Sequence, residues 1–169
     1  MLALVLLEII YVGEFMRENR PGNDINDDFF AGFAPPGRRR AREAALLIQY
    51  QMDFGGSDLQ TAQDVISPLS LNEDNAAFAR QLVEQAHLHK DASDKLIAAH
   101  THEWDFKRLF SIDVAILRLA LGELASSTPA TIVINEAVEL AKKFGDQASP
   151  SFINALLDAV YQKQQEEAP

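Results

Sequence analysis

The sequence predicts an all-helical domain, and three observations lead to this fold class. The segment Ser111–Ala125 is apolar on nearly every side of a 3.6-residue helix, so we expect other helices to surround it. Flanking segments carry apolar residues at helical spacing, as at Val133, Ala137 and Leu140. The short run TIVI also fits this helical period better than a strand. The central helix carries few polar residues, and we expect these to find partners in the interior or to lie where it is thinly covered: Asp113, Arg118 and Glu123.

The other helices follow from apolar stripes and from the residues that end them. Gly55-Gly56 ends the first helix, and Pro150 suits the first turn of the last one, which Ser149 caps. The expected helices are Arg38–Asp53, Ser57–Ser67, Asn72–His89, 91–101, 111–125, Pro129–Gly145 and Ser149 to about Tyr161. An aromatic connector containing Trp104 and Phe106 precedes the central helix. We therefore place one domain at 37–163, followed by a frayed tail at 164–169.

Residues 1–36 form an N-terminal extension in this prediction, partly disordered and separated from the domain by Pro35-Pro36-Gly37. Its apolar start, Leu2–Val12, is too short to span a bilayer, which needs about 20 residues. It also lacks the basic residues of a signal peptide. Two interpretations remain open: a leader without fixed structure, or a segment that docks on the domain or on a partner.

Charge and composition narrow the function classes. The chain has 169 residues, a net charge of −10 and no cysteine. The acidic total argues against nucleic-acid binding over the whole surface, and the absence of cysteine excludes disulfides and thiolate chemistry. It also suits a reducing, cytoplasmic environment.

Positive charge is nevertheless concentrated at one place, where four arginines begin a predicted helix: Arg38, Arg39, Arg40 and Arg42. The helix dipole disfavours cations in a first turn, so this run indicates an anion-binding role. A solvated, charged helix end is the alternative.

Motifs for catalysis and for cofactors are missing. The chain has no P-loop, GxGxxG, GxSxG or HExxH motif, so we predict neither an enzyme nor a bound cofactor. The histidines occur as His87-x-His89 and His100-x-His102, a spacing that points the two rings of a pair to opposite sides of a helix. We therefore expect no metal site. Glu136 and Glu139 share a helical face, and a solvated carboxylate pair is the simplest interpretation of them.

Nucleic-acid binding fits the residues better. Arginine offers planar forks for phosphate and stacks on unpaired bases. A second anion site is expected at Gln147–Phe152, because free N–H groups at a helix start attract phosphate. Phe152 and Tyr50 are candidate stacking surfaces, although Phe152 also fits the core stripe of its helix.

Four segments together resemble the NusB family of transcription antitermination factors. Their order and spacing match the family from Arg38 to about Tyr161, and Trp104 and Asp113 are also in place. The segments are RRRARE (Arg38–Glu43), ILRLALGEL (Ile116–Leu124), INEAVELAKKFG (Ile134–Gly145) and FINALLD (Phe152–Asp158). The resemblance does not extend to residues 1–36.

The resemblance implies a fold of about seven helices in two small sub-bundles. It also implies a non-enzymatic function, the binding of single-stranded boxA RNA in ribosomal RNA leader transcripts together with NusE, a small-subunit ribosomal protein. The assembly acts on the transcription elongation complex and helps RNA polymerase read through terminators. Proteins of this family occur as monomers or as homodimers, so a homodimer is a further expectation.

The family's functional positions carry over residue by residue. The RNA-contacting positions are Arg38, Arg39, Arg40, Arg42, Gln147, Ser149, Phe152 and Asn154. Tyr50 and Asp113 match positions on the side that faces NusE. The chain departs from the family at Ala155, where glycine is common, at Ala148, where an acidic residue is frequent, and at Pro150. These departures concern the loop of the second RNA region.

Two other functions remain as alternatives. A helical module that binds proteins or itself would ignore RNA. NusB-like domains also form the first part of some ribosomal RNA methyltransferases, which use catalytic cysteines. Because this chain has no cysteine, it would be at most an RNA-binding fragment of such an enzyme.

Overall fold

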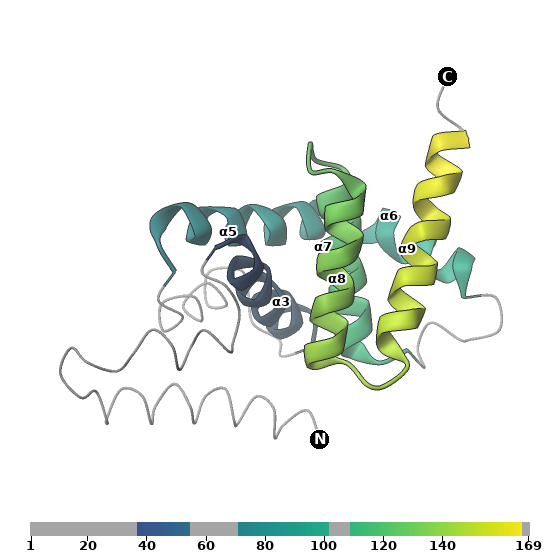
Figure 1. Ribbon diagram of the computed structural model, residues 1–169, viewed down its shortest axis with the longest axis horizontal. Coiled ribbons are helices and arrows are strands. Elements are labelled where there is room, and N and C mark those ends of the chain that lie inside the picture. The colour runs from purple at the N-terminus through teal and green to yellow at the C-terminus, as the bar shows by residue number, and fades with distance from the viewer. Residues whose placement is uncertain (1–36, 55–70, 102–108, 167–169) are drawn as a thin grey trace. The chain divides into compact units, whose positions relative to one another are not determined.

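A computed structural model describes residues 37–54, 71–101 and 109–166, which belong to a compact unit spanning Gly37–Pro169. All regular structure in these ranges is helical, which confirms the predicted fold class (Figure 1). The six helices are α3 (Arg38–Phe54), α5 (Glu73–Leu88), α6 (Lys90–His100), α7 (Ser111–Leu124), α8 (Ala130–Phe144) and α9 (Ser149–Glu166). The predictions for the N-terminal extension, for helix Ser57–Ser67, and for Trp104 and Phe106 concern residues outside the described ranges.

Helix α7 is the centre of the domain, as its sequence predicts. Every residue from Ile112 to Glu123 is buried, and α7 contacts each of the other five helices. The other extensive contacts fall into two groups, α3 with α5, and α9 with α6 and α8. These groups correspond to two small sub-bundles that share α7, and α8 and α9 lie beside α7 in Figure 1.

Helix boundaries follow the local signals closely. Asn72 caps α5 by accepting a hydrogen bond from the backbone N–H of Asn75. A turn at His89 separates α5 from α6, so the expected continuation into 91–101 is a distinct helix. Helix α9 continues to Glu166, three residues beyond the boundary expected at 163.

Two of the three polar side chains on α7 have buried ion-pair partners, as expected. Arg118 reaches Asp94 on α6, with 2.8 Å from Nε to Oδ1, and Asp53 on α3, with 2.7 Å from Nη1 to Oδ2. Burial alone raises the pKa of Asp53, but hydrogen bonds from Gln49, Arg118 and Lys90 outweigh it and hold the pKa below its usual value. This network ties α3, α6 and α7 together.

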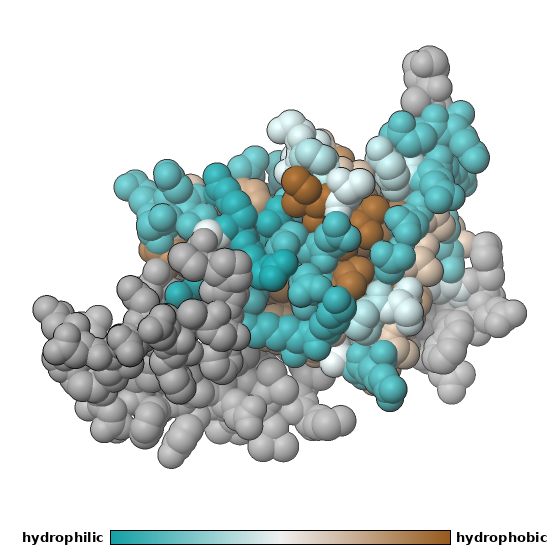
Figure 2. Space-filling model, in the orientation of Figure 1, coloured by the Kyte–Doolittle hydropathy of each residue, from teal (hydrophilic) through white to brown (hydrophobic). Residues whose placement is uncertain are grey.

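On the face seen in Figure 2, the described ranges are mainly hydrophilic, and hydrophobic residues show only in small areas. Over all the described ranges, the exposed large apolar side chains are Phe54, Leu88, Phe110 and Ile132. Among the described helices, none combines the length and apolar character needed to cross a membrane. Over the same ranges, histidine and carboxylate side chains form no group of three suited to a metal ion.

Candidate nucleic-acid interface

The arginine run forms the first turn of α3, but the four guanidinium groups have four different environments. Arg38 is exposed. Its Nη1 donates a hydrogen bond to the carbonyl oxygen of Asp74 at 3.2 Å, and its Cζ lies 4.3 Å from the ring centroid of Phe78. Both partners are on α5. Arg38 is therefore held at the edge of the domain with its charge accessible to solvent.

Arg39 faces α8 and is half-buried. It donates two hydrogen bonds to Glu136, from Nε at 3.3 Å and from Nη2 at 2.9 Å, and Glu139 lies 3.9 Å from its Nη1. The hydrogen bond to Glu136 raises the pKa of Arg39 above its usual value. The side chain of Glu136 is only 17% exposed, so its interpretation as a solvated carboxylate is wrong.

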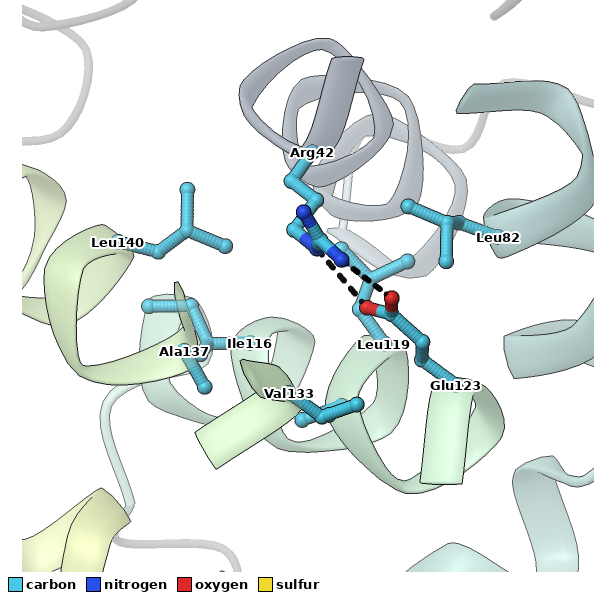
Figure 3. Close-up of a pocket in the computed structure, with 9 residues that line it drawn as sticks. Arg42, Leu82, Ile116, Leu119, Glu123, Val133, Ala137 and Leu140 are labelled. Atoms are coloured by element: carbon cyan, nitrogen blue, oxygen red, sulfur yellow. Dashed lines mark hydrogen bonds and ion pairs between the residues drawn. The ribbon is translucent and has the colours of Figure 1, made fainter. Parts of the chain in front are cut away.

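Arg42 points into the domain. It makes a two-pronged ion pair with Glu123 of α7, Nε to Oε2 at 3.0 Å and Nη2 to Oε1 at 2.5 Å. Leu82, Leu119, Leu140 and other apolar side chains surround the pair and line a cavity of about 10 Å³ beside it (Figure 3). Such a volume holds about one water molecule. This site is a structural contact rather than an open ligand pocket.

Arg40 is partly exposed, and no hydrogen bond or ion pair joins it to the other described residues. Local sequence could not distinguish these four arginines, because contacts with α5, α8 and α7 set the environments of Arg38, Arg39 and Arg42. The sequence identified the cluster correctly as a feature of α3. It gave no signal for Phe78, which lies 40 positions after Arg38.

The second region predicted to contact RNA is the start of α9, and Asp146 organises it. One carboxylate oxygen of Asp146 accepts hydrogen bonds from the backbone N–H groups of Ala148, at 2.8 Å, and Ser149, at 2.9 Å. These bonds lower the pKa of Asp146. Asp146 therefore performs the capping role that we expected of Ser149, and it occupies two of the N–H groups that we expected to be free for an anion.

The four candidate residues of this region differ in exposure. Gln147 and Asn154 are exposed, and Asn154 donates a hydrogen bond to Asp158 at 2.9 Å. Ser149 is buried, and its Oγ accepts a hydrogen bond from the backbone N–H of Asp146. Phe152 is half-buried and packs against the core, which agrees with the structural interpretation of this ring.

Helix α8 connects the two regions. Arg39 of α3 pairs with Glu136 in the first half of α8, and Glu43, one turn further along α3, pairs with Lys143 at 2.8 Å. Lys143 lies in the last turn of α8, directly before the loop that holds Asp146. The exposed face of α3 and the start of α9 therefore flank the same helix.

Of the two residues predicted to face a protein partner, Tyr50 lies on α3 beside the start of α7, and Asp113 lies in the first turn of α7. The hydroxyl oxygen of Tyr50 is 3.4 Å from Oγ of Ser111, the first residue of α7. Asp113 follows in the same turn and is only 4% exposed. Its Oδ1 has no hydrogen-bond partner among the described residues, and burial raises the pKa of its carboxyl group.

By its fold and site, the chain is an all-helical protein built around one buried helix, α7, with a basic first turn on α3. Comparison with known proteins then gives the family. The NusB family model matches residues 39–162. The chain belongs to the NusB family.

Relatives and solved structures agree with this assignment. The chain is 40% identical to the transcription antitermination protein NusB of Symbiobacterium thermophilum, over 73% of this chain and 88% of the relative. It is 41% identical to the protein of the same name from Myxococcus xanthus, over 73% and 93%.

Among solved structures, it is similar to a crystal structure of the antitermination factors NusB and NusE in complex with dsRNA, with 29% identity and a TM-score of 0.67 over 75% of this chain and 96% of that one. It is also similar to the solution structure of NusB from Aquifex aeolicus, with 28% identity and a TM-score of 0.66 over 78% and 92%.

Proposed function

We propose that this protein is a transcription antitermination factor that binds boxA RNA of ribosomal RNA leader transcripts together with NusE. In this role it helps RNA polymerase read through terminators and acts with the elongation complex in the cytoplasm, without catalysing a reaction. Two relatives at 40% and 41% identity are transcription antitermination proteins, which supports a role in antitermination. The similar NusB–NusE–dsRNA complex supports the two partners.

The single observation that carries RNA binding is the accessible positive charge at the start of α3. The chain has a net charge of −10, yet Arg38 is exposed and Arg40 is partly exposed in the first turn of α3. Such a concentrated basic spot attracts a polyanion locally even on an acidic protein. Arg39 joins them when it exchanges Glu136 for a phosphate. Arg42 contributes by fixing α3 to α7.

At the start of α9 we likewise propose that exposed residues contact RNA and that buried residues position them. Gln147 and Asn154 are exposed and make direct contacts with RNA. Ser149 and Phe152 are buried or half-buried, so they shape the loop that presents these contacts.

A salt titration tests RNA binding. Fluorescence anisotropy with a labelled single-stranded boxA RNA should show a log Kd that rises linearly with log salt concentration, by about 0.7 for each phosphate neutralised on a single strand. Arg40→Ala should weaken binding and reduce this slope by about 0.7, the contribution of one phosphate, without a change in thermal stability. Lys95→Ala, an exposed charge on α6, is the matched control. Salt-independent binding would contradict the proposal.

We place the NusE surface at Tyr50 and the first turn of α7. The proximity of half-buried Tyr50 to Ser111 supports this placement. Asp113 is 4% exposed, so it shapes this surface from the interior and does not contact NusE directly. Tyr50→Ala should raise the Kd for NusE in calorimetry while leaving RNA binding by the isolated protein unchanged. Tyr161→Ala, another half-buried tyrosine on the core, controls for general loss of packing. Equal effects of the two substitutions would contradict a NusE contact at Tyr50.

A further inference from the structure

One aromatic ring on α5 contacts two of the arginines that begin α3. Phe78 lies four residues after Asp74, so the two share a face of α5. Arg38 contacts both, through its Nη1 to the Asp74 carbonyl and through its Cζ above the Phe78 ring. The Cζ of Arg42 is 5.2 Å from the centroid of the same ring. Phe78 is therefore a platform beneath the basic turn.

An aromatic ring and a carboxylate hold a guanidinium group in different ways. Glu136 takes the Nε and Nη2 donors of Arg39, which are the edge that would otherwise bind a phosphate. A ring contacts the guanidinium face instead and leaves the N–H groups in its plane available. Among the described residues, only the Asp74 carbonyl accepts a hydrogen bond from Arg38, which has five N–H donors. Arg38 is thus oriented while most of its donors face solvent.

We infer that Phe78 is a positioning residue for RNA binding, which holds Arg38 in a fixed orientation without consuming its phosphate-binding donors. This inference rests on the proposed RNA-binding function. Restricting a long side chain before the complex forms reduces the conformational entropy lost on binding. The negative face of the ring also offsets the unfavourable position of a cation in the first turn of a helix.

A double-mutant cycle tests the inference with the full chain, saturating NusE and a fluorescein-labelled single-stranded boxA RNA. Phe78→Leu removes the ring and should raise the Kd about two- to fivefold. Phe78→Tyr keeps the ring face and should restore binding. In the Arg38→Leu background, Phe78→Leu should have no further effect, because the residue acts through Arg38.

Tyr161→Leu is the matched control, because it removes another half-buried aromatic ring from the core and should leave the Kd unchanged. If Phe78→Leu lowers the melting temperature enough to unfold the protein, Phe78→Met fills the site without a ring face and carries the same test. Wild-type affinity in the ring-less variants would overturn the inference, as would an equal effect with and without Arg38. Failure of the wild-type chain to bind the RNA would instead overturn the proposed function itself.

Discussion

Arg42 and Glu123 are 81 positions apart in sequence and form a buried ion pair with two parallel hydrogen bonds. Their side chains are 8% and 4% exposed, and apolar residues surround them in Figure 3. The pair joins the first turns of α3 to the last turn of α7. It therefore fixes the position of the helix that presents Arg38, Arg39 and Arg40.

The first prediction concerns the stability supplied by this pair. Arg42→Met leaves Glu123 buried without its partner, so the free energy of unfolding should fall by about 3–5 kcal/mol in urea denaturation. The double substitution Arg42→Met with Glu123→Leu removes both charges and should recover most of the loss. If the double variant is no more stable than the single one, the unpaired charge is not the cause.

A second prediction concerns competition between carboxylates and RNA for Arg39. Glu139 is 40% exposed and lies 3.9 Å from Arg39, and it also pairs with Lys142. Glu139→Gln weakens the hold on Arg39 and should lower the Kd for boxA RNA about two- to fivefold, corresponding to about 0.5–1 kcal/mol for an exposed pair. Anisotropy at fixed salt measures this change.

Glu166→Gln makes the same change in net charge at the end of α9 and serves as the matched control for Glu139→Gln. An equal gain of affinity in both variants would show a general charge effect rather than release of Arg39.

A third prediction follows from the buried carboxyl group of Asp113. Burial raises its pKa, and the charge of Asp146 raises it further, while a hydrogen bond with Ser149 lowers it in part. The Asp113 carboxyl group therefore binds a proton more readily in the folded protein than in the unfolded chain, where the pKa of an aspartate is about 3.9. Stability from this group is present at low pH and is lost as pH rises through the raised pKa.

Asp113→Asn removes this titration and should stabilise the protein by about 1 kcal/mol at neutral pH. The difference from wild type should shrink as pH falls below the raised pKa. Urea denaturation of both proteins across the acid range measures the difference, with Glu84→Gln on the exposed side of α5 as the control. A stabilisation by Asp113→Asn that grows toward low pH would contradict a raised pKa at Asp113.

The fourth prediction concerns the crossing of α5 and α7 at Gly122. A Cβ atom at this position would lie 2.8 Å from the backbone nitrogen and 3.0 Å from the Cα of Ala86. Backbone atoms cannot move aside as the end of a side chain can, so Gly122→Ala should destabilise the protein by about 1–3 kcal/mol. In a helix without this contact, the same substitution stabilises by roughly 0.5–1 kcal/mol. Thermal or urea unfolding gives the sign directly, and a stabilised variant would show that the helices separate without cost.

The sequence by itself determined the helical fold, the central position of α7 and most helix ends. These features depend on residues within one or two turns of each other, such as Asn72 at the start of α5. It also predicted partners or thin covering for Asp113, Arg118 and Glu123. Arg118 and Glu123 have ion-pair partners, whereas Asp113 is buried with one carboxylate oxygen unpaired among the described residues. The basic first turn of α3 was visible as a local run of residues, and the NusB resemblance was visible in the order and spacing of four such runs.

Only the tertiary structure decided what each of these residues contacts. Arg38 and Arg42 are four positions apart on one helix, yet one is exposed above Phe78 and the other is buried against Glu123. The close approach at Gly122 likewise depends on how α5 crosses α7. These distinctions arise from contacts between residues tens of positions apart, and helical periodicity contains no information about them.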